Sequence, residues 1–395
     1  MTEALVLGFG NNIDYEIVWD SGVMEDLVRR YDIGVAELST SADIQSERDL
    51  VISILGFLQS GAGGERFVGA SNIIEDFSRQ FEMKVTLGGT SVRAAIAMHK
   101  LGHRSALHLV TINDHVRRLI PTDSPYVCSN TVESSYPHLI VQFGQGTCVS
   151  AGDIDIRTSR ANRIIYHNDL DNISMALSDA LPALCANAKV LLISGFNAMQ
   201  SEELLRKRLA TLLPVLEDLP QGARVFCEDA GYYNPAFSRL IYTALAEYID
   251  IISLNEDELQ GYLGRPVNLL DATRVVQALA ELHAIIPAPV IVVHTMYWAL
   301  AYGENVADLD EALRGGVSMA TTRFCYGDEF SVQEYQEIAA LPSNKEGAQF
   351  AAAITELLPN GICCVPVAAV THPTPTTIGL GDAFVGGFLP ALVAY

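Results

Sequence analysis

Short apolar runs and stretches of helical spacing alternate along the second half of this 395-residue chain. The apolar runs have the length of buried strands, and the segments between them repeat apolar residues every three or four positions, as helices do. Repeated strand–helix units of this kind predict an α/β fold with a mostly parallel sheet covered by helices on both faces. The predicted strands span 189–194, 224–228, 249–254 and 289–295, and the predicted helices span 201–216, 235–246 and 271–285.

The first half of the chain is less regular. An apolar run over 4–9 ends in glycine, as an interior parallel strand would. A strand over 83–87 leads through two glycines and an alanine-rich helix to a strand over 105–110, which predicts one strand–turn–helix–strand unit. Residues 126–167 are rich in β-forming and turn residues, so we expect a β-rich flap there.

The change from a mixed to a strictly alternating pattern predicts two domains. The larger one, a core, would comprise residues 1–14, 84–127 and 168–395. The smaller one, a discontinuous lid or substrate domain, would comprise residues 15–83 and 128–167.

Composition and charge narrow the classes of ligand. Hydrophobic residues make up 49% of the chain and charged residues 18%, as in compact globular proteins. The net charge of −22 disfavours nucleic acid and anionic membranes as partners, because both would repel it. An anionic ligand would need backbone amides, a few arginines and a divalent metal to offset its charge.

The chain carries no signal that we interpret as targeting it to a membrane or for secretion. Its seven cysteines include no Cys-x-x-Cys pair and are expected to be reduced thiols. Residues 285–303 form the longest uncharged candidate for a membrane span, but their two prolines favour a buried strand and its turn. The first residues lack the basic region of a signal peptide. We therefore expect a cytoplasmic protein without a membrane partner.

The turn Gly379-Leu380-Gly381-Asp382 precedes an apolar run over 383–395, so it predicts a tight loop opening into a buried helix. Free amides and the helix dipole make such a loop an anion site. A carboxylate beside a bound phosphate can take the proton of an incoming hydroxyl, which makes Asp382 a candidate catalytic base. The alternative is that Gly-Asp only caps the helix.

Polar residues also follow several predicted strands. Glu228 and Asp229 end one strand, the Asn255–Glu258 cluster follows the next, and His294 with Thr295 ends a third. The carboxyl ends of parallel strands lie along one edge of the sheet, where carboxylates suit Mg²⁺ with phosphate oxygens and water. Each cluster taken alone also fits a helix N-cap.

Together these motifs resemble the ribokinase-like superfamily. The resemblance rests on Asn255-x-x-Glu258, Gly379-x-Gly-Asp382, Gly88-Gly89 and Asn12-x-Asp14. More narrowly, the chain is similar to the ADP-dependent glucokinase/phosphofructokinase family, whose motifs run in the same order. The segments that carry this likeness are 161–165, 192–195, 253–258, 292–295 and 376–382.

The resemblance implies a ribokinase-like, Rossmann-type nucleotide-binding core with a smaller β-rich lid. It further implies an enzyme of glycolysis that transfers the β-phosphate of MgADP to a hydroxyl of a hexose or hexose phosphate, glucose or fructose 6-phosphate, leaving AMP. The lid would close over both substrates and exclude water.

The resemblance also assigns roles to single residues. Asp382 would be the base, and Arg163 would reach from the lid to the transferring phosphate. The remaining roles fall into three groups. The nucleotide would be bound by Gly379, Leu380, Gly381, His294, Thr295 and Asn255; Mg²⁺ by Glu258 and Glu228; and the sugar by Asp14, Asn12, Glu65, Gly88 and Gly89.

The chain departs from the family pattern at two places, which leaves alternatives open. Phe226 stands where the family has the histidine of a His-x-Glu metal motif, and Thr90-Ser91-Val92 replaces Gln-Ala-Gly after the paired glycines. The alternatives are an ATP-dependent ribokinase-like sugar or nucleoside kinase and a catalytically weak homologue that senses sugar or nucleotide. Fructose 6-phosphate would need basic residues for its phosphate, for which Arg66, Arg157 and Arg160 are candidates. Pattern alone gives no oligomeric state.

Overall fold

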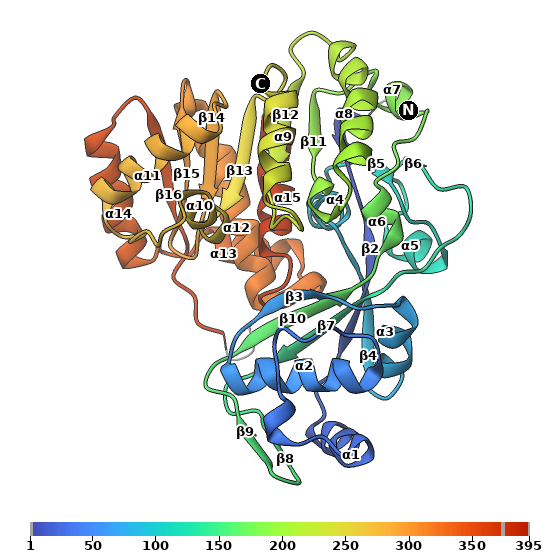
Figure 1. Ribbon diagram of the computed structural model, residues 1–395. Helices are drawn as coiled ribbons and strands as arrows, with labels where there is room; N and C mark the ends of the chain where they lie inside the picture. The colour runs from blue at the N-terminus through green and yellow to red at the C-terminus, as the bar shows by residue number, and fades with distance from the viewer. Residues whose placement is uncertain (1–2, 373–375, 394–395) are drawn as a thin grey trace.

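A computed structural model describes residues 3–372 and 376–393. Its main element is a nine-stranded sheet, shown in Figure 1. All neighbouring strands are parallel except β15, which runs antiparallel to both of its neighbours. In sheet order the strands are β16 (Ile362–Pro366), β15 (Trp298–Gly303), β14 (Val290–His294), β13 (Ile251–Asn255), β12 (Arg224–Glu228), β11 (Val190–Ile193), β1 (Leu5–Leu7), β5 (Ala106–Leu109) and β6 (Tyr126–Cys128).

Helices cover both faces of this sheet, and each face has its own apolar core. One core is formed with α7 (Leu181–Cys185), α8 (Glu202–Glu217), α9 (Ala236–Leu245), α10 (Glu256–Leu263), α11 (Ala272–Ile285) and α14 (Lys345–Leu357). The other is formed with α4 (Thr90–Lys100), α5 (Asp114–Leu119), α12 (Asp310–Tyr326) and α15 (Leu380–Val393). The predicted α/β fold is confirmed, and the predicted strands and helices of the second half agree with the structure to within one or two residues at each end.

A second sheet of five strands lies below the first in Figure 1. Its order is β3 (Gly64–Phe67), β10 (Asn162–His167), β7 (His138–Phe143), β2 (Asn12–Ile17) and β4 (Met83–Gly88). A separate apolar core binds one face of this small sheet to α1 (Ser21–Tyr31), α2 (Glu47–Ser60), α3 (Ser71–Ser78) and the hairpin of β8 (Cys148–Ala151) and β9 (Ile154–Arg157). The other face is turned toward the large sheet. The remaining helices are α6 (Leu170–Ser174) and α13 (Val332–Ala339).

Strand pairing corrects the sequence prediction at the start of the chain. β2 pairs antiparallel with β4, from Asn12 opposite Gly88 to Ile17 opposite Met83. Residues 12–14 and 84–88, which the pattern assigns to the core, therefore belong to the small sheet. The predicted strand–turn–helix–strand order over 83–110 is confirmed by β4, α4 and β5, but β4 and β5 lie in different sheets. The local pattern predicts a strand but does not determine which strand it pairs with.

Three further segments can be compared with the prediction or the sequence. The glycine-rich residues 61–64 lead into strand β3, and the expected flap over 126–167 is divided, with β6 in the large sheet and β7 and β10 in the small one. Residues 285–303 form the end of α11, β14 and most of β15. Within the described part of the chain, no helix has the length and apolar character needed to cross a membrane.

Candidate active site

The turn at Gly379 opens helix α15, as predicted, and places Asp382 in the first helical turn. Gly379 has a φ of 62°, a left-handed conformation that favours glycine, and a Cβ there would lie 2.9 Å from Cδ of Arg93. Arg323, a buried residue of α12, donates from Nε to the carbonyl of Ile378 at 2.7 Å. A side chain of another helix thus fixes the loop, and the first backbone amides of α15 remain available to bind an anion.

A histidine–carboxylate pair lies directly beside this loop. His294, at the end of β14, is 3.1 Å through Nε2 from Oε1 of Glu228, at the end of β12, and its ring lies 4.6 Å from that of Phe384 in α15. A Cβ on Gly381 would come within 3.4 Å of the histidine ring and 3.9 Å of Glu228 Oε1. Burial lowers the pKa of His294, but the hydrogen bond to Glu228 and the charges of the neighbouring glutamates together outweigh it, so the net shift is upward. The loop, His294 and Glu228 therefore form one site.

The third strand end contributes Asn255 and Glu258. Asn255 accepts from the amides of Asp257 and Glu258, and Glu258 Oε2 accepts from the amide of Asn255 at 2.8 Å, which makes a capping box for α10. Burial, together with the charges of Asp229 and Glu228, raises the pKa of Glu258 to about 8. The capping role proposed for this cluster is confirmed, and the carboxylate of Glu258 also faces the acidic edge of the sheet.

The carboxylates at this edge of the sheet fit a magnesium ion whose remaining ligands are phosphate oxygens of a bound molecule and water. Oε2 of Glu228 is buried without a hydrogen-bond partner in the structure. Across residues 3–372 and 376–393, no three His, Cys, Asp or Glu side chains are grouped closely enough to bind a metal by themselves. Mg²⁺ needs only one or two protein carboxylates when phosphate oxygens and water complete its shell. Glu228 and Glu258 meet that requirement.

The opposite side of the site is built on the small sheet. Asp14 on β2 accepts from Asn12 Nδ2 at 2.6 Å and from Arg93 Nη2 at 2.6 Å. Burial raises the pKa of Asp14, and the charge of Arg93 partly offsets this. A Cβ on Gly88 would lie 2.7 Å from Oδ2 of Asp14, so the close approach of β4 requires glycine there. Gly89, with a φ of 91°, is the N-cap residue that precedes α4.

Glu65 and Arg163 lie on paired strands of the same sheet, β3 and β10. Partial removal from water raises the pKa of Glu65, and the charges of His138 and Arg163 oppose that shift. His138, on β7, lies 3.3 Å through Nε2 from Asp169 Oδ2, and its pKa is raised by that contact and by Asp14 and Glu65, against the lowering effect of burial. Asp14, Glu65 and His138 therefore gather on one side of the site.

The comparisons with known proteins decide the family. The model of the ADP-specific phosphofructokinase/glucokinase conserved region matches residues 3–389. The chain belongs to this family. An ADP-dependent glucokinase from Bos taurus is 26% identical over 231 residues, which cover 55% of this chain and 45% of that protein. The match thus spans about half the length of the bovine relative.

Solved structures show the same fold in this family. A phosphofructokinase from Pyrococcus horikoshii with AMP has a TM-score of 0.79 at 15% identity, with 100% of this chain and 98% of that chain covered. An ADP-dependent kinase in complex with fructose-6-phosphate and ADPβS has a TM-score of 0.73 at 14% identity, with 99% and 94% covered. At these identities the likeness concerns the fold.

The position at which the family has a histidine is filled in this chain by the apolar side chain of Phe226. Phe226 is fully buried, with its ring 5.3 Å from Phe388 of α15. Glu228, two residues after Phe226, is contacted by His294 from the end of β14, and β13 lies between these two strands. The sequence does not reveal this contact, because the two residues are distant in the chain and meet only across the sheet.

Some predicted residues are occupied elsewhere. The hydroxyl of Thr295 accepts from the amides of Tyr297 and Trp298 and so stabilises the turn between β14 and β15. Arg66 and Arg160 donate to the carbonyls of Ala42 and Gly61. Arg157 lies exposed on β9. Among the described residues, these arginines form no hydrogen bond or ion pair with Asp14 or Glu65.

Sequence reasoning missed three charged residues of the site: His138, Arg93 and Arg323. A lone histidine in a strand and arginines in apolar helices give no motif. The only available signal was the rarity of arginine among the buried positions of a helix such as α4.

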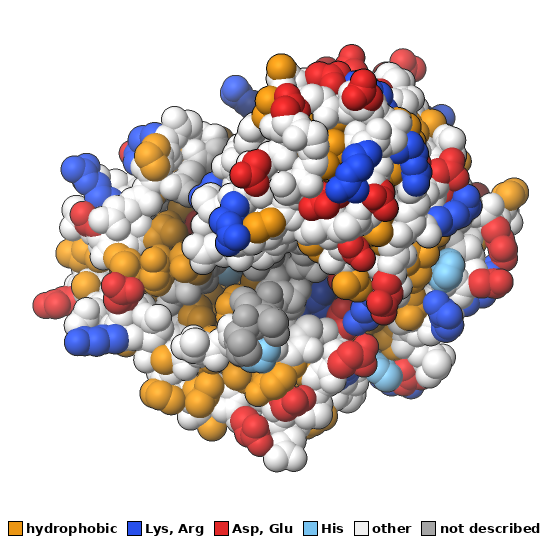
Figure 2. Space-filling view, turned by 90° about the horizontal axis from the view of Figure 1, so that it is seen from below, with side chains coloured by type: hydrophobic (Ala, Val, Ile, Leu, Met, Phe, Trp, Pro, Cys, Tyr) orange, Lys and Arg blue, Asp and Glu red, His pale blue; other side chains and the backbone are white. Residues whose placement is uncertain are grey.

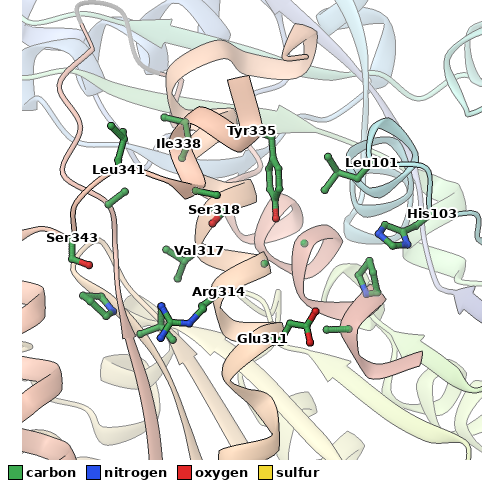
Figure 3. Close-up of a pocket in the computed structure, with 18 residues that line it drawn as sticks. Leu101, His103, Glu311, Arg314, Val317, Ser318, Tyr335, Ile338, Leu341 and Ser343 are labelled. Atoms are coloured by element: carbon green, nitrogen blue, oxygen red, sulfur yellow. The ribbon is translucent and has the colours of Figure 1, made fainter. Parts of the chain in front are cut away.

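A pocket of about 460 Å³ lies away from this site, between α12, α13 and the end of α15 (Figure 3). Arg314, Ser318 and Tyr335 contribute polar groups to it, and Val317 and Ile338 contribute apolar ones. It contains none of the predicted site residues.

Proposed function

We propose that this protein is an ADP-dependent sugar kinase, which transfers the β-phosphate of MgADP to a hydroxyl of a hexose or hexose phosphate and releases AMP. The observation that carries the proposal is the position of Asp382, in the first turn of α15, 3.7 Å from the arginine that binds Asp14. This arrangement places a candidate base between the anion loop and the buried polar side chains of the small sheet. The names of the relatives, an ADP-dependent glucokinase and an ADP-dependent kinase with fructose-6-phosphate and ADPβS, support it.

On the donor side, the amides of Gly379, Leu380 and Gly381 would bind the phosphate to be transferred. His294 lies against the loop and would line the nucleotide site with Thr295 and Asn255. Glu228 and Glu258 would hold Mg²⁺ directly or through water, which offsets the charge of the diphosphate. Arg163 would stabilise charge on the transferring phosphoryl group from the small sheet.

On the acceptor side, Asp14, Asn12 and Glu65 would accept hydrogen bonds from sugar hydroxyls, and Gly88 and Gly89 allow the backbone to approach the sugar. The acceptor oxygen forms a bond to the β-phosphorus while the bond from that phosphorus to the bridging oxygen breaks. The hydroxyl proton passes to Asp382, and AMP leaves with the bridging oxygen. The two-domain division of the sequence analysis, with a lid that closes over both substrates, is part of this proposal.

A substrate panel tests the proposal. The purified protein with Mg²⁺ is given ADP or ATP as donor, and glucose, fructose 6-phosphate, ribose or a nucleoside as acceptor. We expect AMP to form only with ADP and one hexose or hexose phosphate, which also names the acceptor. ADP formed from ATP would instead indicate an ATP-dependent kinase.

The inactive-homologue alternative needs its own readout. Calorimetric titration of ADP and of each sugar into the protein shows binding without relying on turnover. Stoichiometric binding with no product at any Mg²⁺ concentration would contradict the kinase proposal and favour a sensor.

The free cysteines of the structure support a cytoplasmic location, which we include in the proposal.

A further inference from the structure

Arg93 on α4 is one of the two arginines that the structure buries, with 4% of its side chain exposed. A buried guanidinium is costly unless carboxylates and hydrogen bonds compensate it. Nη2 donates to Asp14 at 2.6 Å and lies 3.8 Å from Glu16, and Nε lies 3.7 Å from Asp382. Burial lowers the pKa of Arg93, but Asp14 and Asp382 outweigh it and raise the pKa, so the group stays charged.

These contacts join three elements that are separate in the chain. Asp14 belongs to β2 of the small sheet, Arg93 to α4, and Asp382 to α15, which packs on the large sheet. The Nε and Nη2 hydrogens share one edge of a planar, rigid group. Both carboxylates therefore lie along a single edge of the guanidinium.

The other edge of the guanidinium faces the anion loop. Nη1 is buried without a partner among the described residues, and a Cβ on Gly379 would lie 3.0 Å from it. The positive charge of Arg93 thus lies directly under the turn whose amides open α15. Arg323 supports the same turn through the carbonyl of Ile378 and, among the described residues, forms no hydrogen bond or ion pair with Asp14.

We propose that Arg93 is a positioning residue for phosphoryl transfer: it fixes Asp14, the carboxylate proposed to bind the sugar, relative to the base Asp382. A sugar bound to Asp14 then presents its hydroxyl to Asp382 in one geometry. This inference rests on the proposed function. It differs from a purely structural role, in which loss of Arg93 would lower stability without a selective effect on the sugar and on turnover.

The test compares Arg93→Gln and Arg93→Lys with the wild type in the full-length protein. We expect Arg93→Gln to lower kcat about 100-fold and to raise the KM of the sugar, because the acceptor loses its alignment with the base. ADP affinity, measured by calorimetry, should fall much less than kcat, because the amides of Gly379 to Gly381, His294 and Glu228 all remain in place. Arg93→Lys should recover part of kcat, since lysine restores the positive charge but not the two N–H donors on one edge of the guanidinium.

A double variant separates positioning from general damage. If Arg93 acts through Asp14, Arg93→Gln should cost much less activity in an Asp14→Asn background than in the wild type. The matched control is Arg208→Gln, which removes a part-buried arginine of α8 that donates to the carbonyl of Ser174 at 3.0 Å, and it should leave kcat unchanged. Thermal unfolding of each variant reports folding, and if Arg93→Gln does not fold, Arg93→Lys carries the comparison.

Three outcomes would overturn the inference. They are a variant at Arg93 with wild-type kcat and sugar KM, additive losses in the double variant, and a loss of ADP affinity as large as the loss of kcat. A wild type that forms no AMP with any sugar would overturn the proposed function, and this inference with it. An active wild type matched by Arg93→Gln would overturn this inference alone.

Discussion

Asp382 is 22% exposed and makes its nearest ion pair, at 3.7 Å, with Arg93. If it is the base, Asp382→Asn should lower kcat about 1,000-fold, because the amide cannot take the hydroxyl proton. ADP binding should be retained, since the loop amides are unchanged. Steady-state kinetics and calorimetry measure the two effects. Asp310→Asn, which removes an exposed carboxylate paired with Arg314, serves as the control and should keep full activity. Near-normal turnover of Asp382→Asn would rule out the base assignment.

His108 makes stability depend on pH. It is fully buried on β5, its Nε2 accepts from the amide of Ser178 at 2.9 Å, and its Nδ1 has no partner among the described residues. Desolvation lowers the pKa of His108 from 6.5 to about 4. Protonation would place a charge in the core and turn the accepting nitrogen into a donor facing another donor.

Proton linkage determines whether the free energy of unfolding rises or falls with pH. Above pH 6.5 the ring is neutral in both states, and between 6.5 and about 4 the unfolded state binds the extra proton, so stability falls as the pH falls. The loss should be on the order of 2 kcal/mol at about pH 5. His108→Gln keeps an acceptor without titrating, so its urea-unfolding free energy should depend less on pH than that of the wild type. Parallel pH profiles for the two proteins would contradict this account.

The contact between α12 and α15 depends on two glycines that face each other. A Cβ on Gly387 would lie 2.2 Å from the carbonyl oxygen of Gly315 and 2.6 Å from Cβ of Met319. Because backbone cannot yield as a side chain can, Gly387→Ala should destabilise the protein by about 2 kcal/mol. α15 carries the anion loop, so KM for ADP should rise as well.

A second helical glycine provides the control for this substitution. Gly261 in α10 has no atom within 4 Å of its ideal Cβ. Gly261→Ala should leave the free energy of unfolding unchanged or raise it by up to about 1 kcal/mol, the usual helix-propensity gain. Equal effects of the two substitutions in urea unfolding would show that packing at Gly387 is not the cause.

A contact between two aromatic rings connects the small sheet to the part of the chain that carries the large sheet. Phe67 on β3 packs against Tyr233, from the loop after β12, with ring centroids 4.8 Å apart. The row of ring contacts continues, with tilted rings, from Phe67 to His167 at 4.3 Å and from His167 to His138 at 4.8 Å, beside the residues proposed to bind the sugar. The contact is therefore a candidate for holding the small sheet against the large one when both substrates are bound.

Loss of this contact should weaken closure rather than folding, because Tyr233 is 51% exposed. An aromatic pair contributes about 1 kcal/mol, so Tyr233→Ala should raise the sugar KM roughly fivefold with little change in the unfolding temperature. Tyr233→Phe keeps the ring and should behave as the wild type. A kinetic assay across sugar concentrations decides, and identical KM values for the alanine and phenylalanine variants would contradict the role.

The charge of the whole molecule agrees with a small-molecule function. Figure 2 shows Lys and Arg side chains scattered among Asp and Glu on the face that it presents, with no broad basic patch. Two basic residues of the site, Arg93 and Arg323, are buried singly beside the loop. A polyanion would therefore meet repulsion, whereas a diphosphate can be held locally.

Much of the large sheet could be read from the sequence because each element there is defined by its own neighbours in the chain. Strand β12 coincides with the predicted 224–228, and α11 starts one residue after its predicted start. The Gly379–Asp382 turn was also predictable, since glycine conformation and the first turn of a helix are local properties. The apolar run behind it predicted burial of α15, which the structure shows.

Tertiary structure alone decided which strands pair and which side chains meet. β4 joins the small sheet because β2 offers it six residues of antiparallel pairing, a choice that no local pattern encodes. The meeting of His294 with Glu228, and of Arg93 with both Asp14 and Asp382, joins residues separated by tens or hundreds of positions. Ion pairs and desolvation depend on distance in space, so the sequence determined the chemistry available to this protein, and the fold determined which groups act together.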